Sequence, residues 1–129
     1  MLLPHGTIVA VLDGRHFHLL RNAGDEANPD LAEVDAPKLD THNHSGASHR
    51  DGGAAVMTED AHVLAAVDWL NHEVQAKRIE HLVIIAPPRS MGEIRKAYTK
   101  ALEQKLLGEL AKDLAAKAPA QVLAALRGK

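Results

Sequence analysis

The stretch His81-Leu82-Val83-Ile84-Ile85-Ala86 is an uninterrupted apolar run after its first residue, and Pro87-Pro88 follow it directly. Such a run is typical of a strand that is buried on both faces, which usually means a central, parallel strand. Proline cannot donate a hydrogen bond to a sheet, so the double proline ends the strand. We therefore predict that residues 82–85 lie in the centre of a mixed sheet.

Helical patterns lie on both sides of this strand. Before it, Thr58 can cap an amphipathic helix. The apolar residues of that helix recur at helical spacing: Val63, Val67, Leu70 and Val74. After the strand, Ser90 and Glu93 have the spacing of a capping box, which predicts a second helix that continues through Leu102.

Two strands are expected near the N-terminus. Residues 7–12 and 16–20 are apolar runs separated by Asp13-Gly14, a pair that favours a hairpin because both turn positions adopt positive φ. Residues 31–35 indicate a short third strand. The order of these elements predicts an α/β fold, a mixed sheet with flanking helices, and its simplest form is a ribonuclease H-like topology.

Composition limits the classes of function. The chain has 129 residues, which fits a single domain over residues 1–129, and it contains no cysteine, which excludes disulfides and thiolate sites. The net charge of −2 gives no global attraction to nucleic acid or to an anionic membrane. No signal peptide is visible and no apolar run approaches the roughly 20 residues that span a bilayer. We expect a cytoplasmic protein without membrane insertion.

Residues 38–57 have almost no large apolar side chains, so burial cannot offset the entropy of ordering them. We predict a mobile loop within the domain. Its histidines could ligate a metal, because neutral imidazole is a common ligand. These candidates are His42, His44 and His49. The loop offers no rigid second shell, so we expect a solvated loop and no cofactor.

A family resemblance rests on residues 86–95, which read Ala-Pro-Pro-Arg-Ser-Met-Gly-Glu-Ile-Arg. This stretch resembles the signature of the bacterial host attachment family. Residues 11–14, Val-Leu-Asp-Gly, and 108–114, Gly-Glu-Leu-Ala-Lys-Asp-Leu, are similar to further parts of that family's pattern. The likeness covers nearly the whole chain. The family is similar to the middle domain of class 1 translation release factors, which implies a ribonuclease H-like architecture.

The region from Lys105 to Ala111 has two interpretations. Leu106, Leu110 and Leu114 are spaced by four, which favours a helix, whereas the resemblance implies a strand, and Gly108 weakens the helix. We adopt the strand.

No catalytic constellation is recognisable. Gly52-Gly53 is followed by Ala54 rather than glutamine, so the peptidyl-ester hydrolysis of release factors is not carried over. Asp13 resembles a nuclease carboxylate, but metal-dependent phosphodiester chemistry needs several converging acids. The host attachment family's name refers to a proposed role in attachment to host cells and defines no biochemical activity.

The main candidate site consists of Arg89, Ser90, Gly92 and Arg95, at the end of the buried strand and the start of the next helix. Free N–H groups, the helix dipole and two arginines suit a phosphate or a carboxylate. Alternatively, Ser90 and Glu93 satisfy the helix end themselves, and Arg89 pairs with an acidic neighbour.

Three functions compete. The first is a non-enzymatic host-attachment-family protein that acts through an unknown protein partner. The second is an RNA- or ribosome-associated module, in which Arg89, Arg95, Lys96 and Lys100 form a local basic face. The third is a small hydrolase whose site the sequence does not reveal. Fold analogy alone is a weak warrant, so we rank the second below the first.

Overall fold

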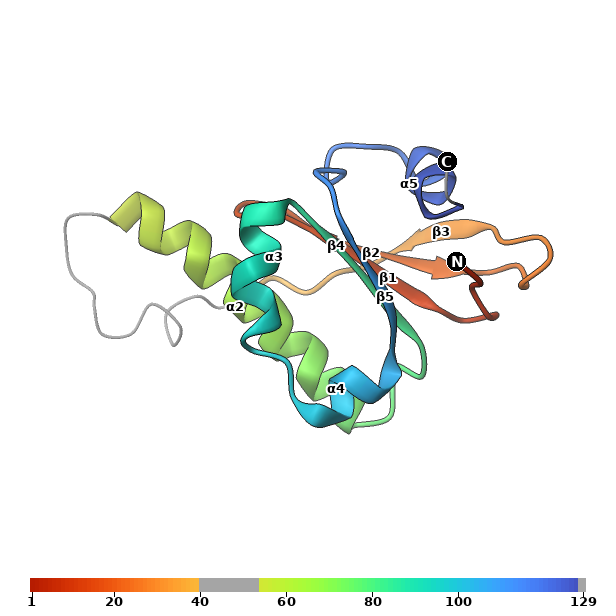
Figure 1. The fold of residues 1–129 in the computed structure, drawn as a ribbon, viewed down its shortest axis with the longest axis horizontal. Coiled ribbons are helices and arrows are strands. Elements are labelled where there is room, and N and C mark those ends of the chain that lie inside the picture. The colour runs from red at the N-terminus through yellow and green to blue at the C-terminus, as the bar shows by residue number, and fades with distance from the viewer. Residues whose placement is uncertain (40–53, 128–129) are drawn as a thin grey trace.

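The computed structural model describes residues 1–39 and 54–127 (Figure 1). Most of the predicted mobile loop, including His42, His44 and His49, lies outside these residues. Its last residues are helical, because the following helix begins at Ala54 and not after Thr58. The predicted start of that helix is therefore wrong.

A five-stranded mixed sheet, in the order β3-β2-β1-β4-β5, forms the centre of the molecule. Its strands are β1 (Ile8–Leu12), β2 (Phe17–Asn22), β3 (Leu31–Val34), β4 (Leu82–Ala86) and β5 (Leu106–Ala111). The β1–β2 and β2–β3 pairs are antiparallel, while β4 runs parallel to both β1 and β5. This arrangement confirms the predicted mixed α/β class and is compatible with the ribonuclease H-like fold of release-factor middle domains.

Helices cover both faces of the sheet (Figure 1). One face carries α2 (Ala54–Gln75), α3 (Pro88–Arg95) and α4 (Lys100–Lys105), and the other carries α5 (Pro119–Leu126). Successive side chains of β4 alternate between two hydrophobic clusters, so Ile84 packs toward α2 and Ile85 toward α5. Every residue of β4 is buried, which confirms the central strand predicted from its apolar run. Among the described helices, none has the length and apolarity needed to cross a membrane.

The hairpin between β1 and β2 is confirmed, but the predicted turn chemistry is wrong. Leu12 pairs with Phe17, so residues 13–16 form the turn, and Gly14 does not have positive φ. The Asp13 carboxylate closes the turn by accepting bonds from the backbone N–H of Arg15 at 2.8 Å and of His16 at 2.7 Å. Gly14 is needed for space, because a Cβ there would lie 2.9 Å from the Cβ of Glu59.

The helix predicted after β4 is broken into α3 and α4. Asn71 of α2 holds the break, because its amide donates to the carbonyl of Ala97 at 3.0 Å. Its carbonyl oxygen accepts from the backbone N–H of Thr99 at 3.2 Å and from the Thr99 hydroxyl at 3.0 Å. The Thr99 hydroxyl also accepts from the N–H of Leu102, which caps α4.

The strand interpretation of the segment after α4 is confirmed. Gly108 pairs with Val83 and Leu110 with Ile85 in the parallel ladder, so β4 satisfies backbone groups that a helix would have bonded internally. The spacing of leucines was misleading because β5 is an edge strand with partly exposed side chains rather than an amphipathic helix face.

Candidate functional site

The start of α3 lies at the carboxyl end of β4, beside the β1–β2 turn. In α/β sheets, ligands favour the carboxyl ends of the strands at the point where the strand order reverses, which here lies between β1 and β4. A shallow cavity of about 260 Å³ occupies this edge. Its lining residues are Asp13, Gly14, Arg15, Glu59, Pro87, Arg89 and Ser90.

The predicted capping box at Ser90 is wrong. The helix begins at Pro88, with Pro87 as its N-cap residue and no side-chain cap. Proline suits this first position because its fixed φ is already helical and it has no N–H to satisfy. Ser90 therefore lies inside the first turn, and the carboxylate of Glu93 reaches forward to Lys96 at 3.6 Å instead of folding back.

Arg89 is exposed at the mouth of the cavity, and in the described part of the chain its guanidinium has no ion-pair or hydrogen-bond partner. The backbone N–H groups of Arg89 and Ser90 and the Ser90 hydroxyl are also without partners among those residues. The first N–H groups of a helix carry partial positive charge. This turn thus offers several donors and one full positive charge to solvent.

Arg95 is not part of this arrangement. Its Nε donates to Oε1 of Glu109 on β5 at 2.9 Å, and the hydroxyl of Tyr98 donates to Oε2 of the same carboxylate at 2.6 Å. Burial, reinforced by the Glu109 carboxylate, raises the pKa of Tyr98. The charge of Arg95 is therefore engaged within the protein.

The predicted basic face is largely neutralised. Lys96 pairs with Glu93 and Arg95 with Glu109, which leaves Arg89 and the exposed Lys100. Gly92 is exposed on α3, and a Cβ there would meet no atom within 4 Å. Of the four predicted site residues, only Arg89 and Ser90 line the cavity together.

Sequence reasoning missed Arg15 and Glu59, whose side chains meet at the cavity with Nε 3.6 Å from Oε2. The signal that could have found Arg15 is its place in a turn directly after a strand. Burial raises the pKa of Asp13, but bonds from the N–H groups of Arg15 and His16 and from the His16 ring outweigh it, so the pKa is lowered. Within residues 1–39 and 54–127, no three histidine or acidic side chains gather as a metal site.

The β3-β2-β1-β4-β5 mixed sheet with helices on both faces is compatible with a release-factor-like α/β domain. The sequence profile of the bacterial archaeo-eukaryotic release factor family 12 matches residues 6–126, and the chain belongs to that family. A comparison with curated proteins found no match. The predicted relation to release-factor domains is thereby confirmed, whereas nothing in the match supports host attachment or a protein partner.

Proposed function

We propose that this chain is an RNA- or ribosome-associated module of the cytoplasm that contacts a phosphate group through Arg89 and Ser90. The observation that carries the proposal is the exposed guanidinium of Arg89 at the carboxyl edge of the sheet, which has no partner among the residues that the structure describes. Membership of a release-factor family supports it, because release factors act on ribosomes.

The local electrostatics favour one phosphate rather than an extended nucleic-acid surface. Arg89 supplies the charge and a planar pair of donors, while the helix N-terminus adds backbone N–H groups. The positive charge of Arg15 is offset by Glu59. Because the carboxylate of Glu93 is directed at Lys96, 3.6 Å away, it does not occupy the helix start. We therefore expect the contact at Arg89 to be weak and to depend on salt and not on base sequence.

The host-attachment role through a protein partner, which the sequence placed first, now ranks second. The family match supports the relation to release factors and does not support a role in attachment to host cells. No exposed cluster described above selects a protein partner of particular chemistry.

Co-sedimentation with purified ribosomes at increasing salt tests the proposal. The chain pellets with ribosomes at low salt, and the bound fraction falls as salt rises. Arg89→Ala lowers binding at every salt concentration. Arg21→Ala, which removes an exposed arginine near the opposite end of β1, is the matched control and binds like the parent. Failure of the parent to pellet at low salt, or equal binding by Arg89→Ala, would overturn the proposal.

A further inference from the structure

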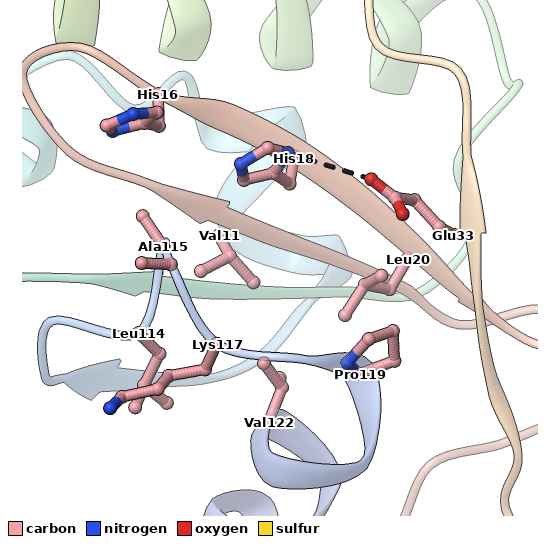
Figure 2. Close-up of a pocket in the computed structure, with 11 residues that line it drawn as sticks. Val11, His16, His18, Leu20, Glu33, Leu114, Ala115, Lys117, Pro119 and Val122 are labelled. Carbon is pink, nitrogen blue, oxygen red and sulfur yellow. Dashed lines mark ion pairs between the residues drawn. The ribbon is translucent and has the colours of Figure 1, made fainter.

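A second cavity lies on the α5 face of the sheet and is distinct from the Arg89 turn. Its volume is about 270 Å³, and it opens between strand β2 and the segment that leads into α5 (Figure 2). Val11, Leu20 and Val122 form its apolar part. His16, His18 and Glu33 form its polar part, beside Val11 and Leu20 on the same face of the sheet (Figure 2).

The His16 ring is held in place before any ligand arrives. Nδ1 of His16 lies 3.0 Å from Oδ1 of Asp13, whose carboxylate is itself fixed by the turn backbone. A carboxylate only accepts, so Nδ1 carries the hydrogen and, in the neutral ring, Nε2 is an acceptor. The His16 and His18 rings are nearly parallel, with centroids 6.1 Å apart.

Glu33 keeps its accepting capacity. The distance of 3.8 Å between Nδ1 of His18 and Oε2 of Glu33 is too long for a hydrogen bond. The carboxylate can therefore accept two parallel N–H bonds from a ligand. The ammonium of Lys117 lies on the other side, beside Leu114, and is not directed at Glu33 (Figure 2).

The shape and polarity of this cavity select its occupant. A cavity of about 150 Å³ accommodates a benzene ring, so this one has room for a two-ring system. Apolar side chains and acceptors lie next to one another on the sheet side of the cavity, which suits a flat heteroaromatic ring with N–H donors on one edge. Guanine has two adjacent donors, at N1 and at the 2-amino group, that match a carboxylate. We propose that this cavity binds a guanine base, with Glu33 accepting from its donor edge.

Amide chemical shifts in the full chain, recorded during titration with guanosine, test this site. Guanosine at about 1 mM shifts resonances of the lining residues His16, His18 and Glu33. Inosine, which lacks the 2-amino group, binds about ten-fold more weakly because one hydrogen bond to Glu33 is lost. Uridine, which lacks both the two-ring system and the adjacent donors, causes no such shifts.

Two variants separate the site from non-specific stacking. Ala116→Trp fills the cavity from an exposed lining position and abolishes the shifts. Glu33→Gln removes the preference for guanosine over inosine, whereas Glu26→Gln, at an exposed position elsewhere, retains it. Absence of shifts with guanosine, or equal affinity for guanosine and inosine in the parent, would overturn the proposal.

The result is independent of the proposed phosphate contact, because guanosine carries no phosphate. Arg89→Ala therefore binds guanosine like the parent. A parent that binds ribosomes but not guanosine overturns only the guanine site, and the reverse result overturns only the phosphate contact.

Discussion

The two arginines of α3 carry the same charge in opposite surroundings. Arg95 would have to give up its bonds to Glu109 before it could bind an external anion, whereas Arg89 has no partner in the described structure to give up. Hydrogen bonds to charged groups contribute about 1.5–3 kcal/mol, so this difference decides which arginine is available. Arg89 is therefore the arginine of α3 that is available to an external anion.

The fold does not require glycine at position 92. It lies inside α3, its φ is not positive, and a Cβ would meet nothing within 4 Å. Because glycine loses more backbone entropy on folding, Gly92→Ala should raise the free energy of unfolding by about 0.5–1 kcal/mol. Urea unfolding measures this. Gly24→Ala is the control with the opposite sign, because its Cβ would overlap the carbonyl oxygen of Asn28. A destabilised Gly92→Ala would contradict the open geometry.

Asp13 gives a pH dependence. Its pKa is lowered from 3.8 on folding, because the turn's hydrogen bonds together outweigh burial. A carboxyl of this kind stabilises the fold above its unfolded pKa, and the contribution is lost as pH falls through the folded pKa. The difference in free energy of unfolding between the parent and Asp13→Asn should be constant above about pH 5 and shrink below about pH 4. A difference that does not vary with pH would contradict the turn chemistry.

At the C-terminal end of helix α2, a residue other than glycine adopts the left-handed backbone conformation. This residue is Lys77, whose φ is 65°. Its backbone N–H donates to the carbonyl oxygen of Val74, and the backbone N–H of Arg78 donates to the carbonyl oxygen of Glu73. This is a Schellman motif, in which glycine is the usual residue with positive φ.

Lys77→Gly should therefore raise the free energy of unfolding by about 0.5–1 kcal/mol. Thermal melts of both proteins check this. Lys77→Ala removes the same charge but keeps a Cβ, so it serves as the control and gives no comparable gain. Equal effects of the two substitutions would show that the charge matters rather than the backbone.

Elements whose signal is local could be predicted from the sequence. The apolar run of β4 identified the central strand, and the hairpin followed from two apolar segments around Asp13-Gly14. The break between α3 and α4 could not be predicted, because it depends on Asn71, which is distant in sequence. The start of α3 was misplaced because Ser90 and Glu93 match a capping box that Pro88 makes unnecessary.

At the scale of the whole molecule, the sheet decides which residues of the candidate site act together. Parallel pairing of β4 with β5 brings Glu109 to Arg95, and pairing of β1 with β4 brings the Asp13–His16 turn to Arg89. Neither contact has a local signature. The start of α3 could therefore be identified as a candidate site from the sequence. The pairing of Arg95 with Glu109 and the presence of Arg15 at the cavity could not be identified.

The proposed phosphate contact of Arg89 can be measured through the salt dependence of RNA binding. Fluorescence anisotropy with a labelled oligouridine, which carries no guanine, gives the dissociation constant at several salt concentrations for the parent, Arg89→Ala and Arg21→Ala. We expect weak, salt-dependent binding, with the log–log slope reduced in magnitude by about 0.7 in Arg89→Ala and unchanged in Arg21→Ala. A parent that does not bind at low salt, or an Arg89→Ala slope equal to that of the parent, would contradict it.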